Sequence, residues 1–274
     1  MRLGNRMVRS ALLGLFVLGC AHQLRPTPPV DPAADLLAAA RARPIPPRLI
    51  GKFSLSLAIP GRDGVSTGGA VVLDRPGKGH VAVLGPLGGP LATLQTDGTG
   101  VAVAVSRGHQ HFVATDADAV LRDATHGAVT LDDLFGLFVG DVPLDDAQVV
   151  GRRALAEGAE VVLQGPDGST VTLDLARDAT PRLLRAVDRD GKVELEATYA
   201  PFEPLAGTTE LVPTELTLEL PDLGVEAGVR MKSWSVPDTV PDVFGLAPPD
   251  GFTSEPLEDL LGHAGGLGDV LGTP

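Results

Sequence analysis

Apolar and polar side chains alternate along much of the chain. The clearest runs are Lys52–Ile59, Val101–Ser106, Thr170–Leu175, Lys192–Tyr199 and Glu215–Leu220. A period of two with one apolar face predicts strands of a sheet that is covered on one side. Asp190-Gly191 predicts a tight hairpin between Arg185 and Tyr199. About eleven or twelve strand candidates favour a mostly β fold, with a strongly curved or barrel-like antiparallel sheet.

Three short segments depart from this period and predict helices. Asp35–Arg43 is rich in Ala and Leu, with Asp35 as a capping residue and Pro44 as the stop. Asp116–Asp123 predicts a second helix. Thr130–Val139 predicts a third, with Thr130 and Asp133 as a capping box.

The third predicted helix has one apolar stripe, made by residues at helical spacing: Leu131, Leu134, Phe135 and Phe138. We expect this stripe to lie on the apolar face of the sheet. It could fill the core as a permanent plug, or it could act as a lid over a cavity. The pattern alone leaves both readings open.

The N-terminus has the features of an export signal. Arg2, Arg6 and Arg9 precede the apolar run Ala11–Leu18, which is shorter than the roughly 20 residues that a transmembrane helix needs. The run ends in Leu18-Gly19-Cys20, which resembles the lipobox of bacterial lipoproteins. The resemblance implies cleavage before Cys20 and lipidation of its thiol. The alternative is an unmodified cysteine in an ordinary signal peptide.

These features divide the chain into four parts. We expect a lipoprotein signal peptide over 1–19, a lipidated Pro-rich tether over 20–34 and a β-domain over 35–236. Residues 237–274, rich in Pro and Gly, predict a loosely docked and partly disordered arm. No internal repeat and no second domain boundary is visible.

Charge narrows the range of partners. Without the three arginines of the signal peptide, 19 of the 22 basic residues remain against 35 acidic ones. This balance argues against nucleic acid, which requires a basic surface. It also argues against broad electrostatic adhesion to anionic lipid. We therefore expect membrane contact through the anchor at Cys20 or through local apolar groups.

Candidate chemistry is sparse. His109 and His111 would share a face if both lay on a strand, which could begin a metal site. The alternative is two polar residues on a solvated strand face, and we favour it because no further ligand flanks them. No nucleophile elbow, phosphate loop or dinucleotide fingerprint is present. We expect no catalytic residues, no metal and no cofactor.

Three segments in order, together with the lipobox, resemble the LolA/LolB lipoprotein-localisation family. They are a strand pair joined by Pro86-Leu87-Gly88 within 80–97, the helix and Pro-containing loop of 130–143, and two closing strands within 213–234. The resemblance covers roughly residues 35–236. It implies a curved, incomplete antiparallel barrel of about eleven strands closed by short helices.

The resemblance also implies a function. LolB-like members bind the acyl chains of lipoproteins in an apolar cavity, accept them from a LolA-type periplasmic carrier and insert them into the outer membrane. A protruding leucine assists insertion, and the corresponding residue is Leu87. Leu87 could instead fold back onto the core as an ordinary turn residue.

We expect a monomeric, lipid-anchored protein of the outer membrane that faces the periplasm. The residues expected to line its cavity are Phe53, Leu55, Leu57, Val103, Leu131, Leu134, Phe135 and Phe138. A structural or assembly lipoprotein that kept the fold without transport is the alternative, and its cavity would be filled by its own side chains. An enzyme is the third reading, and it would require a buried polar cluster around His109 and His111.

Overall fold

The computed structural model describes residues 32–61, 64–124, 131–141 and 147–262. The predicted signal peptide, Cys20 and most of the predicted tether lie outside these ranges. So does Thr130, the first residue of the predicted capping box.

One large sheet contains fourteen strands of the described residues, in the order β16-β6-β5-β4-β3-β2-β1-β15-β14-β11-β10-β9-β8-β7. The first half of the chain supplies β1 Arg48–Ala58, β2 Val65–Asp74, β3 Lys78–Leu84, β4 Pro90–Asp97, β5 Val101–Val105 and β6 Gln110–Ala114. The second half supplies β7 Gln148–Leu155, β8 Gly158–Gln164, β9 Thr170–Ala176, β10 Pro181–Val187, β11 Val193–Tyr199, β14 Glu215–Leu220, β15 Val225–Ser235 and β16 Thr253–Pro256. A separate ribbon pairs β12 Phe202–Pro204 with β13 Leu211–Pro213.

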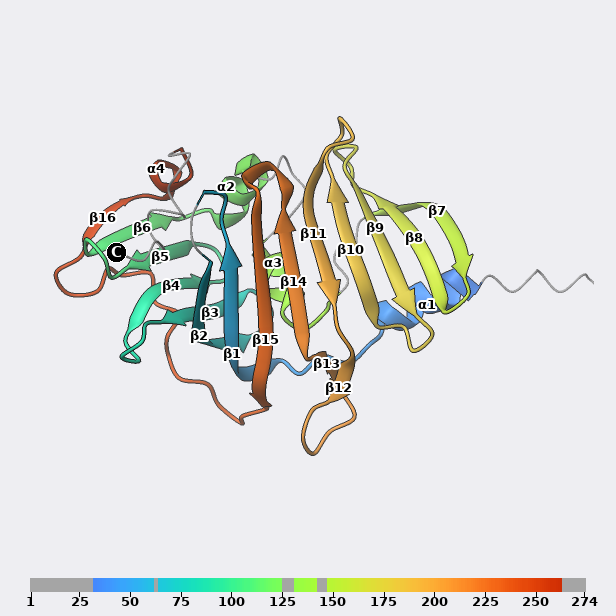
Figure 1. Ribbon diagram of the computed structural model, residues 1–274, viewed down its shortest axis with the longest axis horizontal. Coiled ribbons are helices and arrows are strands. Elements are labelled where there is room, and N and C mark those ends of the chain that lie inside the picture. The colour runs from blue at the N-terminus through green and yellow to red at the C-terminus, as the bar shows by residue number, and fades with distance from the viewer. Residues whose placement is uncertain (1–31, 62–63, 125–130, 142–146, 263–274) are drawn as a thin grey trace, which may run out of the picture. The chain divides into compact units, whose positions relative to one another are not determined.

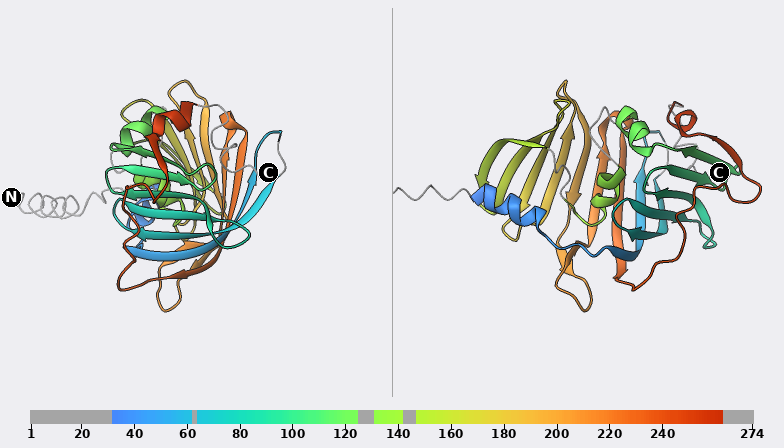
Figure 2. Two further views of the ribbon diagram at one scale, coloured as in Figure 1. Left: turned by 90° about the vertical axis from the view of Figure 1, so that its left-hand side faces the viewer. Right: turned by 180° about the vertical axis from the view of Figure 1, so that it is seen from behind.

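The predicted fold class, a mostly β fold with a curved antiparallel sheet, is confirmed, but the sheet has fourteen strands in the described residues where about eleven were expected. The sheet is curved and almost wholly antiparallel, and it is open, with β16 and β7 at its two edges (Figures 1 and 2). Each alternating run of the sequence lies in a strand to within one residue. The predicted Asp190-Gly191 hairpin joins β10 and β11.

Four short α-helices and one 3-10 helix accompany the sheet in the described residues: α1 Pro32–Arg41, α2 Ala117–Ala124, α3 Leu131–Leu137, α4 Leu257–Gly262 and η1 Pro221–Leu223. The predicted start of the first helix is wrong. Asp35 lies in the first turn and is not the cap, and residues 32–34 are helical although they were assigned to the tether. Proline suits a first helical position because its missing N–H has no partner to lose there.

Helices α1 and α3 lie on the same side of the sheet, which we call the inner face (Figure 2). The strand register shows that this face is apolar across neighbouring strands. Opposite one another lie Leu57, Ala227, Leu218, Ala197, Leu184, Leu173 and Val161. Helix α1 covers the β7–β9 end, where it buries Ala33, Leu37 and Ala40.

Aromatic rings pack against glycines where α3 meets the inner face. Phe53 of β1 stands opposite Gly69 of β2, and its ring occupies the space that a side chain at Gly69 would fill. The ring of Phe135 of α3 lies in the same way against Gly79 of β3. Phe138 then contacts Phe53, with ring centroids 6.1 Å apart. Glycine without a Cβ therefore lets the rings approach the strand backbone.

Arg43 contacts three separate segments near the end of α3: the turn after α3, β13 and β12. Its guanidinium donates to the carbonyl oxygens of Val139 and Gly140, at the C-terminal end of α3, and to that of Leu211 in β13, at 2.7 Å from Nη1. The same group lies 5.2 Å from the centre of the Phe202 ring. These contacts attach the turn that follows α3 to β13 and to the segment between α1 and β1.

The C-terminal arm, defined here as residues 237–256, packs on the outer face of β1–β6 and ends as a strand. The Arg48 guanidinium donates to the carbonyl of Asp238, and the Gln95 amide donates to that of Gly245. Strand β16 then pairs with β6 in parallel, from Thr253 opposite Gln110 to Pro256 opposite Val113 (Figure 1). The sheet therefore extends past residue 236, the predicted end of the β-domain, because this segment satisfies the edge of β6 although it lacks alternation.

The ring-on-glycine contact predicts a sharp difference between two neighbouring positions. A Cβ at Gly69 would lie 2.1 Å from the Phe53 ring and 2.8 Å from the carbonyl oxygen of Ala82. Gly69→Ala should therefore lower the free energy of unfolding by about 1–3 kcal/mol, because the ring and the backbone must both move. Denaturant unfolding measures this change.

The matched control is Gly68→Ala on the same strand. Its Cβ would have no neighbour nearer than 3.9 Å, so stability should stay within about 0.5 kcal/mol. Equal effects of the two substitutions would contradict the packing described here.

Arg43→Met should loosen the C-terminal end of α3, because it leaves the carbonyls of Val139, Gly140 and Leu211 without their donor. We expect the local free energy of opening to fall by about 1–3 kcal/mol. Hydrogen exchange of the amides in 135–141 measures it, with Arg41→Met, at an exposed position of α1, as the control. Unchanged protection in the Arg43 variant would refute the anchoring role.

Candidate functional site

The inner face of β1–β5 carries a patch of apolar side chains that are only half buried. We call it the inner patch, and it consists of Leu55, Val81, Val83, Leu94 and Val103. Register places Val81, Leu94 and Val103 side by side on three successive strands. These three form an uninterrupted aliphatic row, whereas Leu55 has the half-buried Thr67 opposite it on β2.

The end of the inner face under α1 is more deeply covered. On β8 and β9 the side chains of Val161, Leu163 and Leu173 have no exposed surface, because α1 lies over this end. Within the first half of the sheet, Val71 and Phe112 flank the inner patch and are also buried. Partial exposure is therefore concentrated in the middle of β1–β5, and it recurs at Leu218 on β14.

The sequence-predicted cavity residues are brought together by the fold. Phe53, Leu55, Leu57 and Val103 all lie on the inner face. Phe53, Leu57 and Phe135 are buried, whereas Leu55, Val103, Leu134 and Phe138 are half buried and pack against the core. Leu131 is the first residue of α3, and its side chain lies outside what the structure describes.

Leu87 is fully exposed, with 101% of its reference surface accessible. It lies in the loop between β3 and β4, so the alternative of a turn residue folded onto the core is wrong. Hydrogen bonds hold the loop: Gly85 N donates to Gly89 O at 2.7 Å, and Gly88 N donates to Gly85 O at 2.9 Å. Gly88 has φ +83°, which a residue with a side chain rarely adopts.

Polar groups gather where α3 ends. Burial raises the pKa of Tyr199 well above its usual range, and its hydroxyl has no hydrogen-bond partner among the described residues. Burial also lowers the pKa of Arg43, although Asp141 opposes this effect. Asp141, in the segment after α3, pairs with Arg75 from the turn between β2 and β3. These groups fix the end of α3, and no catalytic pairing is visible among them.

The two histidines that sequence reasoning paired do not share a face. His109 is exposed in the turn before β6 with φ +51°, whereas His111 on β6 has no exposed surface. Both the metal-site reading and the reading of two solvated strand residues assumed one strand, and both are wrong for that reason. No group of three or more His, Cys, Asp or Glu side chains in the described ranges could hold a metal ion.

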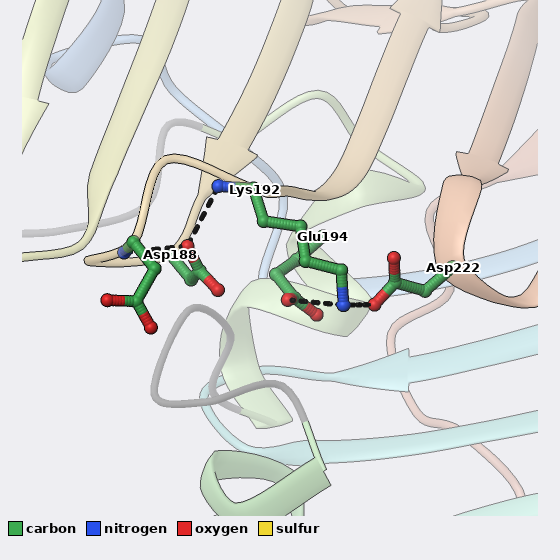
Figure 3. Close-up of polar contacts among 5 residues, drawn as sticks. Asp188, Lys192, Glu194 and Asp222 are labelled. Atoms are coloured by element: carbon green, nitrogen blue, oxygen red, sulfur yellow. Dashed lines mark hydrogen bonds and ion pairs between the residues drawn. The ribbon is translucent and has the colours of Figure 1, made fainter.

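A polar cluster on the second half of the sheet is structural. The side chain of Lys192 lies between Glu194 and Asp222, and so ties the β10–β11 turn to η1 (Figure 3). Asp188 accepts the backbone N–H groups of Asp190 and Lys192, each at 2.8 Å. These contacts shape the turn, as aspartate commonly does.

A hollow of about 460 Å³ lies where β6 and β16 meet α2 and α4. Its lining combines apolar groups with three carboxylates: Val113, Ala114, Thr115, Asp116, Ala119, Val120, Ser254, Glu255, Pro256 and Glu258. The Asp116 carboxylate already accepts the Ala119 amide at the start of α2.

Sequence reasoning missed several contributors to the site. Arg43 and Tyr199 carry no sequence signal, because their partners come from distant segments. Val81 and Leu94 could have been found, since each follows the period of its strand. No helix among the described residues is long and apolar enough to cross a membrane.

Comparisons with known proteins place the fold. No model of a known protein family matches the chain, and no curated protein matches its sequence. A LolA superfamily protein from Nitrosomonas europaea is structurally similar, with a TM-score of 0.55 and 14% identity over 79% of this chain and 98% of that one.

Two further structures are similar to the same degree. A DUF1329 family protein from Desulfovibrio piger has a TM-score of 0.56 and 10% identity, over 78% of this chain and 97% of that one. A domain assigned to outer membrane lipoprotein sorting, from Vibrio parahaemolyticus, has a TM-score of 0.56 and 11% identity, over 77% and 94%. The chain therefore has a LolA-like fold, a large curved and mostly antiparallel sheet with a few short helices.

Proposed function

We propose that this protein is a lipoprotein-sorting-like protein of the cell envelope that binds acyl chains on the inner face of its sheet. The observation that carries the proposal is the half-buried inner patch beside α3. Each acyl methylene removed from water contributes about 0.8 kcal/mol, so an apolar surface needs few polar groups to hold a chain. The fold, shared with proteins named for lipoprotein sorting, supports the same role.

Helix α3 is the element that must respond to a ligand. Leu134 and Phe138 are half buried, and Phe138 contacts Phe53 at the margin of the inner patch. An acyl chain could extend the covered surface by packing beside these rings, or it could displace α3 from them. Arg43 and the Arg75–Asp141 pair would then keep the end of α3 attached to the sheet.

Membrane attachment and delivery form the second part of the proposal. Lipidation at Cys20 would hold the protein at the outer membrane, facing the periplasm, since multiple acyl chains give stable anchoring. Leu87 would enter the lipid, because transfer of a fully exposed leucine side chain from water to lipid is favourable and its loop is already held by hydrogen bonds. A LolA-type carrier would supply the lipoprotein.

A structural lipoprotein without transport is the second candidate. The observation in its favour is that Phe53, Leu57 and Phe135 are already buried by the protein's own side chains. This candidate predicts that α3 never leaves the inner face and that no acyl chain binds. Both candidates are binding or structural roles, and neither requires catalysis.

Acyl binding is tested with a fluorescent fatty acid and the soluble chain that lacks residues 1–19 and carries Cys20→Ser. Leu94→Asn places a polar amide in the inner patch and should weaken binding about tenfold, because that amide loses water without a new partner. Thr93→Asn, on the other face of β4, is the matched control and should bind as the parent does. No saturable binding by the parent chain would favour the structural candidate.

Delivery is tested by transfer of a radiolabelled lipoprotein from a purified LolA-type carrier to this chain and on to liposomes. Leu87→Glu should accept the lipoprotein normally and deliver it at least about tenfold more slowly, because a carboxylate resists burial in lipid. Val150→Glu alters another exposed apolar residue, on β7, and should leave delivery unchanged. Equal delivery by both variants would remove Leu87 from the mechanism.

A further inference from the structure

Every histidine in the described residues contacts the C-terminal arm. His80 hydrogen bonds to the backbone of Val243. His109 meets Phe252 edge to face, with ring centroids 5.3 Å apart, and its carbonyl accepts the Thr253 amide at 2.8 Å. His111 Nδ1 lies 3.0 Å from the Ser254 hydroxyl oxygen. Strand β3, the β5–β6 turn and strand β6 therefore each place an imidazole against the C-terminal arm.

His111 can accommodate only one proton on its ring. Nδ1 and the Ser254 hydroxyl satisfy each other, whereas Nε2 is buried without a partner. A second proton would place an N–H donor at Nε2 with no acceptor to receive it. A charged imidazolium would also lose water completely, since His111 has no exposed surface.

His80 has the same limitation at the middle of the arm. One side of its ring bonds to Gln95 and to the backbone of Val243, whereas Nδ1 is buried and has no partner. Phe244, the next arm residue, is buried nearby over Lys78, whose Nζ lies 6.0 Å from the ring centre. Protonation of His80 therefore adds a buried donor that has no acceptor.

Charged groups around the two rings do not offset this cost. The elements that flank His111 carry Glu255 on β16, Glu258 and Asp259 on α4, Asp116 before α2 and Arg107 in the β5–β6 turn. Those that flank His80 carry Lys78, Asp74, Asp97, Asp238 and Asp242. None of these groups contributes to the lowered pKa of His80 or of His111, for which burial is the largest cause.

We propose that the C-terminal arm is an acid-released strap, which leaves the outer face of the sheet when His80 and His111 become protonated. Release would uncover the edge of β6 together with Ala102 and Ala104, which are buried on the outer face. An uncovered edge strand presents unpaired backbone groups that another strand can bind. The proposal concerns the arm and does not depend on acyl binding.

The direction of the pH effect follows from the two rings. Burial lowers the pKa of both histidines from 6.5 in the docked arm, and undocking returns them toward that value. The docked state thus binds fewer protons, so docking is complete above pH 6.5 and weakens as the pH falls below it.

The test is hydrogen exchange of arm amides 243–256 in the purified protein between pH 7.5 and 5, corrected for intrinsic exchange rates. We expect arm protection to fall at least about tenfold per protonated histidine, while amides of β8–β10 stay protected. Constant arm protection over this range would overturn the proposal.

Variants assign the effect to the two rings. His80→Gln combined with His111→Gln cannot gain charge and should flatten the pH profile, whereas His109→Gln, at an exposed position, should retain it. An unchanged profile in the double variant overturns the proposal. If the arm of the double variant is already undocked at pH 7.5, the same exchange measurement on Phe244→Ala tests the proposal instead. Its weakened docking should move the acid transition to higher pH, and an unchanged midpoint would overturn the proposal.

Discussion

The structure depends on covering one apolar face of a very wide sheet. Most strands of the fourteen-stranded sheet place their large aliphatic side chains on the inner face, and an open sheet has no opposing wall of its own. Burial of this face is the main stabilising contribution that a β-domain without disulfides can make. Helices α1 and α3 supply the cover, and they do so unequally, so that partial exposure remains over β1–β5 and at Leu218 of β14.

The cover over β1–β3 consists of aromatic rings that pack directly on glycines. Phe53 and Phe135 lie close to the backbone only because Gly69 and Gly79 have no side chains. Such contacts are apolar and weakly directional, unlike the hydrogen bonds of Arg43 at the end of α3. Helix α3 is thus held at its C-terminal end by hydrogen bonds and along its length by ring contacts.

Edges are the second constraint on an open sheet, because unpaired strand groups invite association. The chain protects one edge with its own arm, which pairs β16 with β6 and lays Phe244 on the outer face. The other edge, β7, has an irregular register near Val149 and carries Arg152 and Arg153. All three histidines of the described residues contact this arm. Their protonation is therefore the proposed cause of its release at low pH.

Much of the fold could be predicted from the sequence, because strand alternation is a local property. Lys192–Tyr199 and Glu215–Leu220 show their apolar face without reference to any neighbour, and the stripe of α3 shows its contact side. The pattern left the exposure of Leu87 open and gave His111 wrongly as solvated. Both outcomes depend on which distant segment packs against the residue. Alternation says which side chains share a face, but only the tertiary structure decides how completely distant segments cover that face.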